Sequence, residues 1–388
     1  MSDWKIARLE ELAAPAKSAM ATGPFGSAVS SKNFRSQGIP MLRGSNLSED
    51  VGTRLIESDL VYLDPDLVET FKRSVAKAGD LIFTCWGSVG QIGFLDGKSK
   101  YDKYIVSNKQ MKLTPDQTKV VPLFLYYYLS QPAMLDLVKG QAIGSTIPGF
   151  NLGQLRALPV QLPIRAEQRA IAEALGALDD KIAANVRASD TVSALAETHF
   201  RNLMTAAIKE VTLGNILTLE YGKPLPAPSR EAGIVPVYGS GGIVGLHNQS
   251  LVGGPGVIVG RKGTAGAVHW SPVPHFAIDT TYFVIPKDPK RGAHFCYFVL
   301  KSLKLNEQNS DSAVPGLNRN DAYSMKLQLP DDDKMRAFNE LVKPLFYLSA
   351  QLAAENYTLA ATRDALLPQL MSGKLRVRDA EKTVEAVV

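Results

Sequence analysis

Cysteine is nearly absent from this 388-residue sequence, which contains only Cys85 and Cys296. The two lie in different halves of the chain, and neither has another cysteine near it. This spacing excludes a disulfide framework and a CxxC metal-binding knuckle. We therefore interpret both residues as small apolar side chains of a protein core.

Long hydrophobic runs are also missing, although 45% of the residues are hydrophobic. The longest apolar segments, such as Val120–Leu129, fall well short of the roughly eighteen residues that a membrane-spanning helix requires. The N-terminus lacks the basic-then-apolar pattern of a secretory signal. We expect a cytoplasmic protein with no membrane partner.

Motifs for nucleotide and cofactor binding are incomplete. The glycine-rich segment Gly239–Gly245 fails the GxGxxG spacing, and Arg261–Thr264 and Ser372–Lys374 fail the P-loop pattern. No Pro-Pro dipeptide occurs, which excludes the Asn/Asp-Pro-Pro-aromatic loop that holds a flipped base in amino-methyltransferases. We expect no cofactor in this chain.

Metal-site patterns are missing in the same way. The five histidines form no HExxH or other paired-ligand spacing. The acidic run Asp331–Asp333 opens an expected helix, where carboxylates complement the positive end of the helix dipole. We therefore expect no metal site and no catalytic residue, so that the chain is not an enzyme.

Charge of one sign is in small excess, with a formal net charge of +5. Residues 1–164 carry 18 Lys and Arg against 15 Asp and Glu, and residues 208–330 carry 12 against 8. The intervening segment 165–207 and the final segment 331–388 each have a net charge of −1. This distribution favours two globular parts that touch a polyanion and helices that do not.

Two long helices are the strongest pattern that is present. Residues 165–207 contain no proline and one glycine, and their apolar residues recur at steps of three and four, as on one face of a helix. Residues 331–374 contain a glycine-free stretch with apolar residues mostly seven apart, as in a coiled coil. About forty helical residues span roughly 60 Å, so each helix needs a partner.

The two helices and the segments leading into them are related by a constant shift of 167 positions, as from Ile171 to Phe338. Ser145–Asn151 matches Ser312–Asn318 under the same shift. We infer an internal duplication, in which each copy is a globular domain followed by a helix. The expected divisions are 1–164, 165–207, 208–330, 331–374 and a flexible tail, 375–388.

Loops that combine glycine with cations, hydroxyls and aromatics are the candidate DNA contacts, because Arg and Lys contact phosphates or guanine and Asn contacts adenine. Taken singly, each of these residues could equally belong to a solvated turn. Equivalent places in the two domains carry such residues, and this pairing favours a binding role. The candidates are Lys32, Arg43, Ser45, Asn46, Trp86 and Ser88 in the first domain, and Tyr238, Ser240, Arg261, Lys262 and Thr264 in the second.

These motifs together resemble the specificity subunits of type I restriction-modification systems. The resemblance covers nearly the whole chain. The segments that carry it are Gly23-Pro24-Phe25-Gly26-Ser27, Leu42-Arg43-Gly44-Ser45-Asn46-Leu47, Arg261-Lys262-Gly263-Thr264, Leu162–Arg169 and Leu366–Leu375.

The resemblance implies an α+β fold, with two mixed α/β target-recognition domains joined by two long antiparallel coiled-coil helices and related by a pseudo-twofold axis. It implies a non-catalytic subunit that reads the two halves of a bipartite double-stranded DNA target. Half-sites about one to two DNA turns apart would match the helix length. The alternative is a coiled-coil protein-interaction scaffold that does not read DNA.

The expected partners are two methyltransferase subunits and, for restriction, two translocase-nuclease subunits. By the resemblance, S-adenosylmethionine, ATP and magnesium belong to those subunits, which use them for adenine methylation and DNA translocation. The methyltransferases dock on the helices, and the residues expected to contact them are Ile171, Leu175, Leu178, Leu345, Leu352 and Leu359.

Two features depart from a symmetric pattern. Pro344 lies inside the second helix, so we expect a kink or a late helix start there. The second copy lacks the Leu-Arg-Gly-Ser-Asn segment of the first. Contact residues such as Arg43 and Asn46 therefore have no direct counterpart in the second domain.

Overall fold

The computed structural model describes residues 4–25, 28–144, 148–308 and 316–388. The chain forms two compact units: residues 1–183 with 356–388, and residues 184–355. Each long helix is thus divided between the units, unlike the division into separate helices that the sequence predicts. Parts of the duplicated segments, Ser145–Ile147 and Ser312–Pro315, lie outside the described residues, as do Gly26 and Ser27 of the glycine-proline loop.

The first unit contains two four-stranded sheets and a separate strand pair. Their orders are β2-β9-β6-β7, β4-β3-β8-β5 and β1-β10. The strands are β1 (Lys5–Arg8), β2 (Met20–Thr22), β3 (Ile39–Leu42), β4 (Val61–Leu63), β5 (Val75–Lys77), β6 (Leu81–Thr84), β7 (Ile92–Phe94), β8 (Lys103–Val106), β9 (Gln110–Leu113) and β10 (Pro159–Leu162). The short helices are α1 (Pro65–Thr70), α2 (Pro122–Ser130), α3 (Pro132–Gln141) and α4 (Leu152–Ala157).

The second unit repeats this strand plan. Its sheets have the orders β12-β18-β15-β16, β14-β13-β17 and β11-β19. The strands are β11 (Lys209–Thr212), β12 (Leu217–Tyr221), β13 (Val235–Gly239), β14 (Gly242–His247), β15 (Gly256–Gly260), β16 (Val268–Ser271), β17 (Phe276–Ala277), β18 (Thr281–Pro286) and β19 (Lys326–Leu329). Its helices α6 (Gly292–Ser302) and α7 (Arg319–Ser324) precede β19 as α2 and α4 precede β10, but the described part of the second unit has no counterpart of α1 and β5, so the duplication is preserved in outline.

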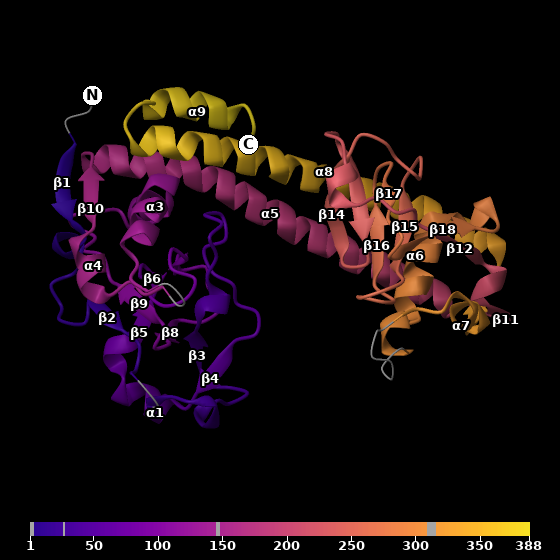
Figure 1. The fold of residues 1–388 in the computed structure, drawn as a ribbon, viewed down its shortest axis with the longest axis horizontal. Helices are drawn as coiled ribbons and strands as arrows, with labels where there is room; N and C mark the ends of the chain where they lie inside the picture. Colours follow the sequence, from indigo (N-terminus) through magenta and orange to yellow (C-terminus); the bar gives the residue numbers. More distant parts are fainter. Residues whose placement is uncertain (1–3, 26–27, 145–147, 309–315) are drawn as a thin grey trace. The chain divides into compact units, whose positions relative to one another are not determined.

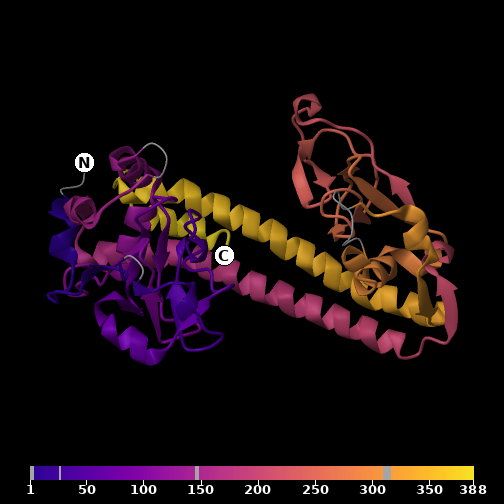
Figure 2. The same cartoon turned by 60° about the horizontal axis from the view of Figure 1, so that its bottom comes forward.

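The long helices are α5 (Arg165–Met204) and α8 (Asp332–Met371), each continuous over 40 residues. Figures 1 and 2 show both as unbroken rods. In the second unit the two run antiparallel, because Asn185 bonds Glu355 and Ser189 bonds Ser349. The α+β class and the long paired helices are as the sequence predicts.

Each unit has its own hydrophobic core. In the first, Ile171, Leu175 and Leu178 of α5 pack with Leu359 and Leu366 of α8 and with the β-domain. The helix residues that join the core of the second unit are Ala196, Phe200, Met335, Phe338 and Val342. Both cysteines are buried, and burial raises the pKa of Cys85 to about 11 and that of Cys296 to about 12, which confirms them as core thiols.

Two local features differ from what the sequence predicts. Residues 375–388 are not a flexible tail, because α9 (Val377–Glu385) lies beside α8 and buries Ala380 and Val384 in the first core (Figure 1). Of the two expected consequences of Pro344, a late helix start is not found, since α8 begins at Asp332 and continues through the exposed Pro344, where water can solvate the carbonyl left without a partner. A break before Pro132 separates α2 from α3.

Candidate nucleic-acid interface

A tight loop follows strand β6 in the first domain and places Trp86 at the surface, with half of the side chain exposed. Gly87 (φ 86°) and Gly90 (φ 110°) adopt left-handed backbone conformations that favour glycine. The Trp86 ring lies against Gly149, where an added Cβ would come within 2.5 Å of the ring. The loop is fixed by the bond from the Phe150 amide to the Cys85 carbonyl, at 2.9 Å.

This loop borders a pocket of about 460 Å³ in the first domain. Four of the predicted DNA contacts line it together: Arg43, Ser45, Trp86 and Ser88. A neighbouring hollow of about 710 Å³ shares Trp86 with it and is bordered by the cations Arg73 and Arg156. The structure therefore brings together residues that are far apart in sequence and that were predicted without knowledge of their positions in space.

Asn108, Lys109 and Gln110 also line the pocket, although the sequence did not predict them as DNA contacts. They lie between β8 and β9 or open β9, and the only sequence signal was the polar Ser107-Asn108 pair that interrupts an apolar stretch. Lys109 is exposed, and the ion pairs of the described residues involve the neighbouring lysines Lys98 and Lys112 but not Lys109. Its ammonium group is therefore available to an anion at the mouth of the pocket.

Lys32 and Arg43, two first-domain candidates, differ in their surroundings. Lys32 is exposed on a short 3-10 turn, Ser31–Asn33, and does not line the pocket. The Arg43 guanidinium donates to the Asp59 carbonyl at 2.7 Å, while its buried Nε has no hydrogen-bond partner in the part of the chain that the structure describes.

The prediction of a DNA contact at Asn46 is wrong. The side chain is 0% exposed, and its Oδ1 accepts a bond from the Arg43 amide at 3.0 Å. Its Nδ2 donates to the carbonyls of Ile56 and Ser58, at 3.0 and 3.1 Å. The amide therefore holds the loop after β3 in shape and has no donor left for a base.

The second domain has an equivalent loop between β15 and β16. Gly263 (φ 78°) and Gly266 (φ 81°) repeat the left-handed glycines, and the Leu317 amide bonds the Arg261 carbonyl at 2.9 Å, as Phe150 bonds Cys85. Lys262 therefore occupies the place of Trp86 and is likewise exposed. One backbone frame presents an aromatic ring in one domain and a cation in the other.

The other second-domain candidates differ from one another in position and in contacts. Thr264 belongs to this loop and Ser240 lies beside it, since a Cβ on Gly263 would be 3.4 Å from Ser240 Oγ and one on Gly241 would be 3.7 Å from Thr264 Oγ1. Arg261 donates to the Asp279 carbonyl through Nε and NH2, at 3.1 and 2.7 Å, and lies over the Tyr221 ring. Its guanidinium is therefore already held by the protein.

The prediction for Tyr238 is wrong, because its side chain is 5% exposed and buried in the domain. Its ring contacts His269 and His275, and its hydroxyl donates to the Trp270 carbonyl at 3.4 Å. Burial also raises the pKa of Tyr238. Its place in an apolar strand, Val235–Gly239, is the signal that could have identified it as a core residue.

The predicted partner contacts on the helices are mostly wrong. Ile171, Leu175, Leu178 and Leu359 are 0% exposed, and all four belong to the first core. A coiled-coil stripe faces its own partner, and here it also faces the β-domain, so it leaves no surface for another subunit. Leu345 and Leu352 are half-buried. The exposed apolar residues of the two helices are Val186, Leu195, Leu341, Tyr347, Leu348 and Tyr357.

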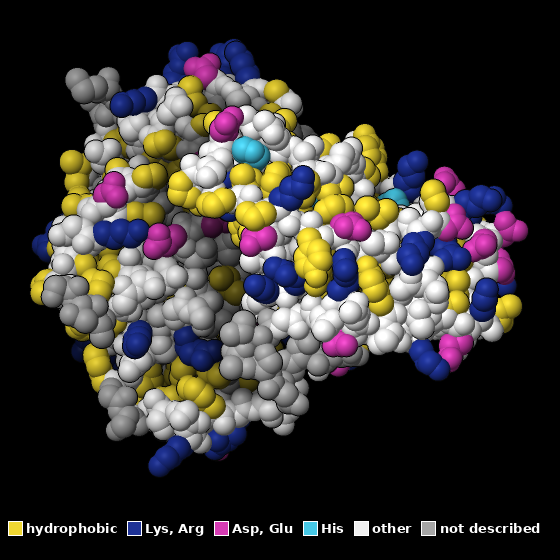
Figure 3. All heavy atoms as spheres, turned by 45° about the vertical axis from the view of Figure 1, so that its right-hand side comes forward, with side chains coloured by type: hydrophobic (Ala, Val, Ile, Leu, Met, Phe, Trp, Pro, Cys, Tyr) yellow, Lys and Arg dark blue, Asp and Glu magenta, His cyan; other side chains and the backbone are white. Residues whose placement is uncertain are grey.

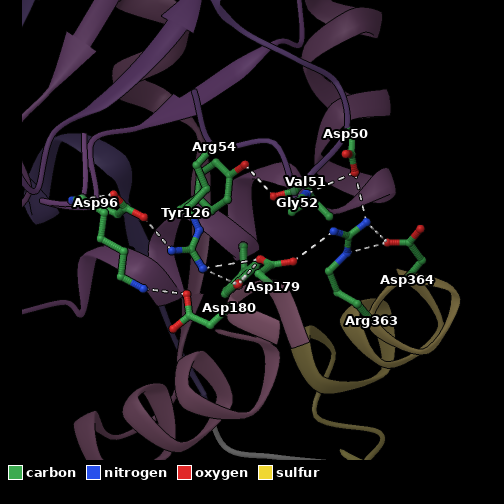
Figure 4. A network of polar contacts seen from close by, with 12 residues as sticks. Asp50, Val51, Gly52, Arg54, Asp96, Tyr126, Asp179, Asp180, Arg363 and Asp364 are labelled. Carbon is green, nitrogen blue, oxygen red and sulfur yellow. Dashed lines mark hydrogen bonds and ion pairs between the residues drawn. The ribbon is translucent and has the colours of Figure 1, made fainter. Parts of the chain in front are cut away.

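A buried polar network joins the first domain to both long helices (Figure 4). Arg363 of α8 donates to Asp179 of α5 and to Asp50 of the domain, each at 3.0 Å. Arg54 of the domain donates to Asp96 at 2.8 Å and approaches Asp179 at 3.5 Å. Since both Arg363 and Asp179 are only 4% exposed at their side chains, this pair depends on mutual neutralisation.

Ionisation in the network follows from burial and charge. Burial alone lowers the pKa of Arg363, but the neighbouring Asp179 outweighs it and raises that pKa above its usual range. Burial, followed by the charge of Asp179, raises the pKa of Tyr126, whose hydroxyl donates to the Val51 carbonyl at 2.8 Å. These groups keep their charge states near neutral pH and hold the domain on the helices.

Charge of either sign is interspersed on the face shown in Figure 3, with hydrophobic patches between the charged side chains. No helix in the described part of the chain has both the length and the apolarity to span a membrane. Residues 4–25, 28–144, 148–308 and 316–388 contain no cluster of His, Cys, Asp or Glu suited to a metal ion.

Comparisons with known proteins identify relatives. Residues 1–192 match the family described as "Type I restriction modification DNA specificity domain". The type I restriction enzyme HindI specificity subunit of Haemophilus influenzae is 23% identical over 205 residues, 52% of this chain and 41% of that protein. The MjaIX specificity subunit of Methanocaldococcus jannaschii is 24% identical over 306 residues, 67% of this chain and 70% of that protein.

A solved structure shares the fold. The type I restriction-modification S subunit from M. genitalium aligns with 95% of this chain and 96% of its own, with a TM-score of 0.64 and 19% identity. At this identity the similarity establishes the architecture. That architecture is the one described above, with two β-domains and two long helices in one chain.

Proposed function

We propose that this chain, whose residues 1–192 belong to the type I restriction modification DNA specificity family, reads the two halves of a bipartite DNA sequence for a methyltransferase complex. The observation that carries the proposal is the repeated loop: Trp86–Gly90 and Lys262–Gly266 share backbone geometry and exposure but differ in side chains. A loop backbone that both domains share, with different contact residues on it, suits two domains that read different bases.

The partners follow from the same proposal. Two methyltransferase subunits dock on the helices and methylate adenine with S-adenosylmethionine, and two translocase-nuclease subunits that use ATP and magnesium join for restriction. We place the methyltransferase contacts on the exposed apolar residues Leu341, Tyr347 and Leu348 rather than on the buried stripe. A complex of this kind would work in the cytoplasm.

The experiment is adenine methylation across the host genome, measured by single-molecule sequencing with and without this gene. Loss of methylation at one bipartite motif on deletion is the expected result, and it yields both half-sites and their spacing. Unchanged methylation while the partner methyltransferase is expressed would contradict DNA reading. It would leave the coiled-coil scaffold as the better description.

A docking variant separates the two roles of the chain. Tyr347→Asp places a charge on an exposed position of α8 and should lower recovery of the methyltransferase with the tagged chain, because apolar contact area is lost. Lys262→Ala is the matched control, since it alters a loop of the DNA-reading domain and should leave recovery unchanged.

A further inference from the structure

The floor of the 460 Å³ pocket carries a buried amide that the protein does not satisfy. Gln110 is 0% exposed, and its Oε1 accepts a hydrogen bond from Ser107 Oγ. Its Nε2 has no hydrogen-bond partner among the described residues. A Cβ on Gly44, another lining residue, would lie 3.7 Å from Nε2 and 3.7 Å from Gln91 Oε1, so the amide lies next to Gly44 in the wall of the pocket. A buried donor without an acceptor is unfavourable unless something else supplies the acceptor.

The second domain shows that the fold does not require this arrangement. Thr281 occupies the place of Gln110, because the Gly222 amide donates to the Thr281 carbonyl as the Gly23 amide donates to the Gln110 carbonyl, both at 3.1 Å. The Thr281 hydroxyl donates to the Ile278 carbonyl at 2.8 Å and is satisfied locally. The first domain thus has a longer side chain whose donor reaches the pocket.

The chemistry of the other lining residues indicates which kind of ligand the pocket could bind. Val29, Phe34 and Met41 line the interior, and Trp86 forms one edge. A bare phosphate gains nothing from such apolar walls. None of the described residues that line the pocket is acidic, and Arg43 and Lys109 add positive charge.

We propose that this pocket accepts one nucleobase that has been unstacked from bound DNA. Gln110 Nε2 donates to an acceptor on the base edge, as amide side chains do in base recognition. The Trp86 ring stacks on the base, and Lys109 contacts a flanking phosphate. A volume of about 460 Å³ falls in the range of small-ligand pockets. DNA as the source of the base rests on the proposed function.

The first test uses the full chain and the four deoxynucleoside 5′-monophosphates, titrated by calorimetry, with deoxyribose 5-phosphate and inorganic phosphate as references. At least one nucleotide should bind more tightly than either reference. If no nucleotide exceeds deoxyribose 5-phosphate, the pocket does not hold a base and the proposal fails.

Variants locate the binding. Gln110→Thr introduces the residue that the second domain uses, and it should weaken nucleotide binding by about tenfold through loss of one hydrogen bond to a buried group. Trp86→Ala at the exposed edge should also weaken it without disturbing the core. Lys262→Ala in the second domain is the control and should bind as the wild type does. Equal binding by all three variants would overturn the assignment.

A competition experiment distinguishes DNA from free nucleotides. A duplex with a single-base bulge should displace the mononucleotide better than the fully paired duplex of the same sequence, and Gln110→Thr should abolish that difference. Displacement by neither or equally by both would overturn base capture from DNA. This outcome is separable from failure of the proposed function, which is judged by genomic methylation after deletion of the gene.

Discussion

The two units use different side chains, charged in one and aromatic in the other, at equivalent positions of their long helices. Under the shift of 167 positions Asp179 corresponds to Phe346, and both contact the helix that follows the sheets of their own unit. In the first unit the Tyr127 hydroxyl of α2 donates to the Asp179 carboxylate, and Arg363 neutralises it. In the second unit the Phe298 ring of α6 contacts Phe346, with ring centroids 5.8 Å apart.

The surroundings explain why each solution holds. Arg54 and Asp50 of the first domain reach the helices and complete a charge network. In the second unit the corresponding place is lined by Trp270, Tyr297 and Phe346, beside a pocket of about 280 Å³. The comparison shows that a duplicated scaffold preserves backbone positions, while each junction can be either a satisfied ionic cluster or an aromatic cluster.

The largest expected effect comes from breaking the ionic junction. Arg363→Met leaves Arg54, 3.5 Å away, as the only cation paired with the buried Asp179 among the described residues, and should lower the free energy of unfolding by about 3–5 kcal/mol in urea titrations. Lys301→Met breaks the exposed pair with Glu197, 2.9 Å apart, and should cost at most about 1 kcal/mol. Equal losses in the two variants would contradict the distinction between buried and exposed pairs.

The aromatic junction should respond to loss of volume. Phe298 is 4% exposed and stacks on Phe200 with centroids 5.4 Å apart, so Phe298→Ala should lower the free energy of unfolding by about 3 kcal/mol. Tyr347→Ala on the exposed face of α8 should change it by less than about 0.5 kcal/mol. A neutral Phe298→Ala would show that this cluster does not stabilise the second unit.

Acid should weaken the second unit through His294, which stacks on Trp270 at 4.6 Å. Burial, with help from Lys343, lowers its pKa from 6.5 to about 4. The unfolded chain therefore binds more protons between these values, and stability falls as pH decreases from 6.5 to 4, by roughly 1–3 kcal/mol. His294→Phe should remove this part of the pH dependence in paired urea titrations, and an identical profile for both proteins would refute the assignment.

The smallest effects should separate the two loops by their salt dependence. Once the target is known, Lys262→Ala should reduce the slope of log K against log salt by about one, because one phosphate contact is lost. Trp86→Ala should weaken binding by about tenfold with an unchanged slope, since stacking carries no charge. The opposite pattern would show that the aromatic and cationic roles have been assigned to the wrong loops.

Periodicity and duplication in the sequence determined the architecture. The apolar spacing of residues 165–207 and 331–374 predicts helices that the structure bounds at Arg165–Met204 and Asp332–Met371. Helical periodicity is local, so it survives without knowledge of the partner. The resemblance and residue type also brought Arg43, Ser45, Trp86 and Ser88 into one set, and they line one pocket.

Only the tertiary structure decided which of the selected side chains remain available. Asn46 and Tyr238 have the residue types of base contacts, but their side chains are buried and form hydrogen bonds with backbone carbonyls of the same domain. The stripe at Ile171 and Leu175 is apolar for the protein's own core, and periodicity cannot distinguish a self-contact from a partner contact. The polar Ser107-Asn108 pair marks the segment before Gln110, but the unpaired donor of Gln110 could not be predicted, because it is defined by what surrounds it in three dimensions.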